Sequence, residues 1–327
     1  MATAIYSVLH FLVDFACAHA MLRLFAVGPG GYESLLVYNF CAFALQMPLG
    51  TLLDTRKHPA FPWIYAGVGV IFTVAGSLGN PGLLGLGNAL FHVGGGVAVI
   101  REDCAKGWNG RALGVFVAPG ALGLFIGTQL AGIMDLRWLL AVGMILLIML
   151  LPSLTGPVPV VRENKPSSRP VSALVCCFLV VVLRSYVGMA VAFPWKQGLA
   201  AGLAAVCAVV LGKIAGGFAA PRFGTKKTVL LSLSLAAVCY LGSDQLLVGV
   251  AALFFFNMSM PITLYQLWLR HPRLPGFSFG ALTFALFLGF VPVYAGWALP
   301  LPGTWLGAAG SLISMGLLMP VCREGDV

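Results

Sequence analysis

Long apolar runs recur along the whole chain, each about as long as the ~20 residues that a helix needs to cross a bilayer. Glycine, proline and charged residues separate twelve such runs. Because 60% of the 327 residues are hydrophobic and only 9% are charged, with a mean hydropathy of +0.97, the composition excludes a soluble domain. The sequence predicts an all-α integral membrane protein with twelve transmembrane helices.

The predicted spans fall into two groups of six. They cover residues 4–26, 31–53, 60–78, 82–100, 111–132, 136–155, 171–193, 197–220, 227–243, 246–268, 276–299 and 303–321. The loops are short except for 156–170, whose proline, serine and charge content is typical of a flexible linker. We therefore predict a six-helix bundle over 1–155, a cytoplasmic linker over 156–170 and a second six-helix bundle over 171–327.

The lysines and arginines predict the orientation. With the N-terminus inside, fourteen of them fall in cytoplasmic loops and tails, and only Arg23, Arg137 and Lys196 fall in outer loops. Cytoplasmic loops of membrane proteins carry an excess of Lys and Arg, so both termini are predicted to be cytoplasmic, in the plasma (inner) membrane. The net charge of +9 then reflects topology, and no nucleic-acid partner is predicted.

Short motifs recur at a nearly constant spacing. GTLLDTRK (50–57) ends the second predicted span and GFAAPRFGTKK (217–227) ends the eighth, with an offset of 167 when Asp54 is aligned with Pro221. Two more pairs of spans have similar offsets: Asn88 and Asn257 are 169 apart, and Gly110, Gly114 and Gly123 lie 166 before Gly276, Gly280 and Gly289. These offsets predict a duplicated six-helix unit.

Two parallel six-helix halves are the plan of major facilitator transporters, and the chain resembles that superfamily over its whole length. The run Gly50-x-x-x-Asp54-x-Arg56 is similar to its signature loop, and a second copy has Gly217 and Arg222 but proline in place of the acid. The resemblance implies that these five residues act in conformational gating. The Asp54 carboxylate would bind basic groups or an exposed helix N-terminus in one conformation and release them in another. The alternative is an ordinary basic loop with one incidental acid.

Within the superfamily, the chain resembles the fosmidomycin-resistance-like branch of drug exporters. The resemblance rests on GNALFHVGG (87–95), on GRALGVFVAPGALGLFIG (110–127) and on a His-x-x-x-Asp pair in the first span. Val93 departs from the proline expected after the histidine in that branch. The branch resemblance implies transport in the direction of efflux.

Ionisable residues inside the predicted spans are the candidate coupling groups. Asp14 is the one acid deep inside a span, where a charge costs at least ~2.5–3.5 kcal/mol on insertion scales. His10 lies four residues earlier on the same helical face, whereas His19 is rotated to roughly the opposite face. His92 and Arg184 lie near the middle of the fourth and seventh spans. Because histidine titrates near neutral pH, we predict that Asp14, His10 and His92 couple protons to transport.

The first, fourth, seventh and tenth spans line the central cavity of the resembled fold, which implies that their polar groups converge there. The predicted substrate-binding residues are Arg184, Asn88, Asn257, Tyr186 and Tyr265. Arg184 is expected to pair alternately with Asp14 and with an anionic substrate. The alternative is a structural Asp14–Arg184 ion pair that holds the two halves together.

These patterns predict a proton-coupled secondary transporter that moves a small amphipathic or anionic compound by alternating access, with efflux favoured. An importer or uncoupled facilitator of a small organic anion is the alternative. A membrane enzyme would need a metal cluster or a nucleophile with its base, and a receptor would need larger soluble loops. The chain lacks a P-loop motif. We predict no enzymatic activity, no cofactor and no metal, and a monomer whose partners are protons, one small molecule and the lipid bilayer.

Overall fold

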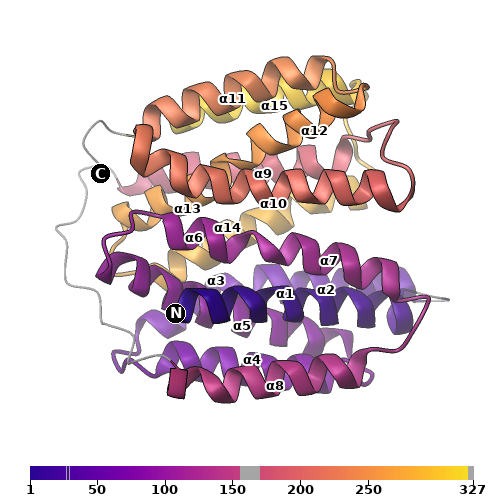
Figure 1. Cartoon of the computed structure of the whole chain (residues 1–327), viewed down its shortest axis with the longest axis vertical. Coiled ribbons are helices and arrows are strands. Elements are labelled where there is room, and N and C mark those ends of the chain that lie inside the picture. The colour runs from indigo at the N-terminus through magenta and orange to yellow at the C-terminus, as the bar shows by residue number, and fades with distance from the viewer. Residues whose placement is uncertain (27, 29, 155–169, 323–327) are drawn as a thin grey trace. The chain divides into compact units, whose positions relative to one another are not determined.

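The computed structural model describes residues 1–26, 28, 30–154 and 170–322, and all the regular structure in this part of the chain is helical (Figure 1). Each predicted apolar segment is helical in the structure. Among the described residues, eight helical segments are long and apolar enough to cross a membrane by length and composition, and three more are shorter apolar helices. The protein is therefore a multi-pass membrane protein.

The helical segments before the predicted linker include two short π-helices, η1 and η2, each of which continues an α-helix. Their bounds are α1 (Ala2–Ala20), η1 (Met21–Phe25), α2 (Gly31–Asn39), η2 (Phe40–Ala44), α3 (Gln46–Asp54), α4 (Phe61–Gly76), α5 (Pro81–Ala105), α6 (Arg111–Val117), α7 (Pro119–Leu130) and α8 (Arg137–Leu154). The linker predicted over 156–170 lies outside the described residues except for Pro170, where the next helix begins.

Seven helices follow that linker. Their bounds are α9 (Pro170–Ala190), α10 (Gly198–Phe223), α11 (Thr225–Leu241), α12 (Leu246–Asn257), α13 (Ser259–Arg270), α14 (Pro275–Tyr294) and α15 (Gly303–Leu318). Two predicted spans are interrupted near prolines, because α6 ends just before Pro119 and α12 ends four residues before Pro261. Proline has no N–H for the carbonyl four residues earlier, and its ring clashes with that carbonyl.

The chain divides into two compact units, each made of segments that are distant in the sequence. One comprises Met1–Gly107, Val115–Glu163 and Arg273–Phe284, and the other comprises Trp108–Gly114, Asn164–Pro272 and Ala285–Val327. The beginning of α14 therefore groups with the first unit, and the segment that begins α6 groups with the second.

Glycines set the helix contacts that position α1 in the first unit. A Cβ on Gly69 or Gly94 would overlap the backbone of the partner helix where α4 and α5 pack together. A Cβ on Gly123 or Gly127 would clash in the same way where α7 packs on α1. Small residues permit such close backbone approach in membrane proteins. Helix α1 consequently packs closely on α7 and also contacts α5.

Candidate functional site

Asp14 lies at the centre of a buried polar cluster between α1 and α5. Its Oδ2 atom is 3.2 Å from Nε2 of His10, and its Oδ1 atom accepts a hydrogen bond of 3.0 Å from Nδ2 of Asn88. Nε2 of His92 is 3.6 Å from Oδ1, an ion-pair distance that is too long for a hydrogen bond. All four side chains are buried, and the two imidazole rings meet edge to face at 4.5 Å.

Each helix contributes two of these residues from one face. His10 and Asp14 are separated by four residues on α1, and Asn88 and His92 by four residues on α5, so each pair projects from successive turns of its helix. The structure thus brings the three predicted proton-coupling residues together. It also places Asn88, which was predicted to bind substrate, on the carboxylate of Asp14.

Helix α7 closes one side of the cluster through a residue with no side chain. A Cβ on Gly120 would overlap both Oδ2 of Asp14 and Nε2 of His10. The sequence shows Gly120 only as one glycine of several in this span, so nothing in it marks this position as part of the cluster. Its role follows from the packing of α7 on α1.

The contacts of Nδ1 in His10 and His92 show which nitrogen of each neutral imidazole carries the hydrogen. Nδ1 of His10 is 2.6 Å from the carbonyl oxygen of Phe116, and Nδ1 of His92 is 2.8 Å from that of Asn88. A carbonyl oxygen only accepts, so each Nδ1 carries its hydrogen. In a neutral ring Nε2 is then an acceptor, and at His10 it would face an acceptor oxygen of ionised Asp14 at 3.2 Å. A proton on Nε2 or on the carboxylate turns this repulsive contact into a hydrogen bond.

The same three groups also have the donor set of a metal site. The ligand atoms of His10, Asp14 and His92 all lie within 4.8 Å of one another. Imidazoles that bind metal commonly donate their other N–H to a backbone carbonyl, as both do here. A chelator control therefore belongs in any test of proton coupling.

Arg184 is buried on α9 and has no hydrogen-bond partner for any of its guanidinium nitrogens among the described residues. Two other predicted substrate-binding residues of this unit make protein contacts: Nδ2 of Asn257 donates to the carbonyl of Leu253 at 2.8 Å, and the Tyr186 hydroxyl accepts from the amide of Leu299 at 2.6 Å. Pairing of Arg184 with Asp14 would join different units and stays a prediction.

Asp54 binds the beginning of α14. Its two carboxylate oxygens accept hydrogen bonds of 2.8 Å from the amides of Gly276 and Phe277. These amides belong to the first turn of α14, where the helix dipole favours a negative charge. A Cβ on Gly50 would overlap the backbone of Gly276, so only glycine allows this approach. Arg56 is exposed and makes no contact with the carboxylate in the part of the chain that the structure describes.

The second copy of the motif repeats the glycine contact without the acid. A Cβ on Gly217 would lie 2.9 Å from Cα of Gly114 and 3.2 Å from the carbonyl oxygen of Gly110. Pro221 occupies the acidic position and offers no carboxylate, and Arg222 is exposed. The two motifs therefore share close helix packing, and the electrostatic contact belongs to the first copy.

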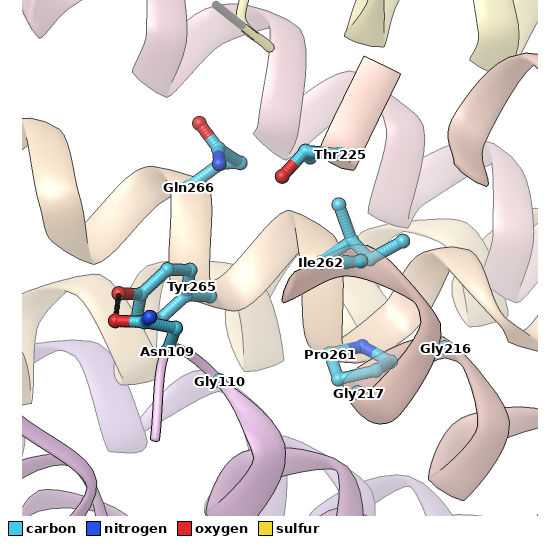
Figure 2. A pocket seen from close by; sticks show the side chains of 10 residues that line it. Asn109, Gly110, Gly216, Gly217, Thr225, Pro261, Ile262, Tyr265 and Gln266 are labelled. Carbon is cyan, nitrogen blue, oxygen red and sulfur yellow. Dashed lines mark hydrogen bonds between the residues drawn. The ribbon is translucent and has the colours of Figure 1, made fainter. Parts of the chain in front are cut away.

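A pocket lies beside this second glycine contact, lined by Gly217 and by residues of α13 (Figure 2). Tyr265, predicted to bind substrate, is on its wall, and its hydroxyl donates to Oδ1 of Asn109 at 3.2 Å. Gln266 also lines the pocket; it is fully buried, and its amide has no partner among the described residues. The pocket shares no lining residue with the Asp14 cluster.

No family model matches the sequence, and no curated protein matches it. Solved structures do match. The major facilitator superfamily transporter FucP, in the outward conformation, has a TM-score of 0.67 at 13% identity over 98% of this chain and 99% of its own. A variant of the E. coli fucose:proton symporter FucP gives 0.64, and the human organic anion transporter MFSD10 gives 0.65, each at 13% identity over 98% of both chains. The chain therefore has the major facilitator fold.

Proposed function

We propose that the protein is a proton-coupled secondary transporter of the major facilitator superfamily that moves a small amphipathic or anionic compound by alternating access. The observation that carries the proposal is the contact between His10 and Asp14, whose arrangement calls for a proton. The fold supports it, as does the E. coli neighbour described as a fucose:proton symporter. Efflux is the favoured direction on the sequence resemblance to the fosmidomycin-resistance-like exporters.

The proposed topology is that of the sequence prediction. Twelve helices cross the plasma (inner) membrane as two six-helix bundles, residues 1–155 and 171–327, with both termini cytoplasmic and the protein monomeric. In the proposed gate of the first half, Asp54 and Gly50 contact the beginning of α14. In the second half, Gly217 makes the corresponding close contact with Gly114. Arg56 and Arg222 are proposed to assist gating from the ends of α3 and α10.

An importer or uncoupled facilitator of a small organic anion is the second candidate. The unpartnered guanidinium of Arg184 favours an anionic substrate, and one structural neighbour is described as an organic anion transporter. In that case the Asp14 cluster would stabilise the fold and carry no proton flux.

Reconstitution tests the proposal directly. Proteoliposomes that contain a pH-sensitive dye and the purified protein are challenged with drugs, organic anions and amphipathic metabolites. We expect one class to evoke a proton flux. Empty liposomes should not show this flux, and 1 mM EDTA should not abolish it. Substrate exchange without any proton flux would favour the facilitator, and proton flux abolished by EDTA would favour a metal at the cluster.

Replacing Gly120 with alanine is expected to lower proton-driven transport about tenfold to a hundredfold, because the new methyl displaces the carboxylate of Asp14 or the ring of His10. Gly143→Ala is the matched control: a Cβ there would meet only Leu12, at 4.0 Å. Initial rates in proteoliposomes, normalised to the amount of folded protein, measure the effect. Equal rates for the two variants would remove Gly120 from the site.

A further inference from the structure

The charge on Arg184 has no counter-ion among the described residues of its own unit. Its side chain is 7% exposed, and Nε, Nη1 and Nη2 all lack a hydrogen-bond partner among the described residues. Val181 and Val187 lie one turn before and after it on α9 and are buried, as is Cys177 two turns earlier. A guanidinium in such surroundings keeps its charge, and an unpaired buried charge is costly.

The acidic residues of that unit do not supply the counter-ion. In the unit that contains Arg184, the described residues include one acid, Asp244, which is exposed in the turn between α11 and α12. In the other unit, Asp14 is bound by Asn88 and the two histidines, and Asp54 by the amides of α14. None of the ion pairs between described residues includes Arg184.

We infer that Arg184 binds the substrate through a single carboxylate, so the substrate is an organic monocarboxylate with an apolar body. This inference rests on the proposed function and names its substrate class. The guanidinium offers N–H groups in a planar fork that matches two carboxylate oxygens. One cation balances one negative charge, and a dianion would leave a net charge beside Val181 and Val187. The same valines suit an apolar body.

Binding to the purified full-length protein tests the inference without any proton gradient. Benzoate, octanoate and 2-naphthoate are each compared with their primary amides, and 2-naphthoate also with 2,6-naphthalenedicarboxylate, by thermal shift in detergent. We expect at least one monocarboxylate to raise the melting temperature, while its amide and the dicarboxylate do not. If no monocarboxylate shifts it, or an amide shifts it equally, the inference is overturned.

Variants place the binding on Arg184. Arg184→Gln should abolish the carboxylate-dependent shift, and Arg184→Lys should weaken apparent affinity at least tenfold because the fork is lost. Lys196→Gln removes an exposed positive charge and should behave as the unchanged protein does. Retention of the shift in Arg184→Gln would overturn the assignment.

The ligand-free proteins give a second readout. Arg184→Leu should melt at a higher temperature than the unchanged protein, because it removes an unpaired buried charge, whereas a structural ion pair requires a lower melting temperature. The proposed function and this inference fail separately. Asp14→Asn should lose proton flux but keep carboxylate binding, so that variant tests the proposed function alone. A proton flux evoked only by a neutral solute would overturn this inference and leave the proposed function standing.

Discussion

Asp14→Asn is expected to abolish proton-driven transport while it leaves substrate counterflow intact. Asparagine has the same shape but carries neither the negative charge nor an exchangeable acidic proton. Nε2 of His10, 3.2 Å from the carboxylate, then loses the group that is proposed to share a proton with it. Gradient-driven flux and counterflow, both measured in proteoliposomes, separate coupling from the conformational cycle.

The controls for Asp14→Asn distinguish lost coupling from lost folding. Glu33→Gln makes the same kind of change at an exposed acid of α2 and should leave both activities unchanged. His10→Gln and His92→Gln should each lower the driven flux, with the larger loss at His10 because its nitrogen is closer to the carboxylate. Full gradient-driven transport by Asp14→Asn would rule out this carboxylate as the proton carrier.

The helices could be predicted closely because membrane insertion leaves a strong signal in the sequence. Apolar runs bounded by glycine, proline and charge locate α1, α5 and α10 to within a few residues. The interruptions before Pro119 and near Pro261 were not predicted, although both prolines are visible. Proline inside an apolar run can bend a helix or break it, and neighbouring helices decide which.

The candidate site was only partly predictable. The spacing of His10 and Asp14 places them on one face of a helix, which the structure bears out. The hydrogen bond of Asn88 to Asp14 depends on how α1 packs on α5, which the sequence does not show. His19, rotated away from that face of α1, is also fully buried, with Nε2 2.8 Å from the carbonyl oxygen of Met134.

For Asp54, the sequence predicts the kind of group that the carboxylate binds but not which residues supply it. The sequence motif implies a carboxylate that binds basic groups or a helix N-terminus; the structure shows hydrogen bonds to the helix N-terminus, and the charge of Arg101 also acts on the carboxylate. Gly276 was visible as a repeated glycine, but only the fold reveals that it touches Gly50. Long-range pairs of this kind require the tertiary arrangement.

Asp54→Asn is expected to speed amide exchange at Gly276 and Phe277 roughly 10- to 150-fold. Both amides donate to the carboxylate at 2.8 Å, and hydrogen bonds to a charged group contribute about 1.5–3 kcal/mol, with 1.4 kcal/mol per factor of ten. The amide of asparagine has one acceptor oxygen and no charge for the helix dipole. Hydrogen–deuterium exchange of a peptide over 275–279, followed by mass spectrometry, measures the opening.

Two further variants make the exchange experiment decisive for gating. Thr55→Ala changes the next residue, whose hydroxyl donates only to the carbonyl of Leu52, and should leave exchange at α14 unchanged. Gly50→Ala keeps the carboxylate but forces the backbones of α3 and α14 apart, so it should speed exchange by sterics alone. If Gly50→Ala opens the contact and Asp54→Asn does not, packing holds this gate closed and the carboxylate has no gating role.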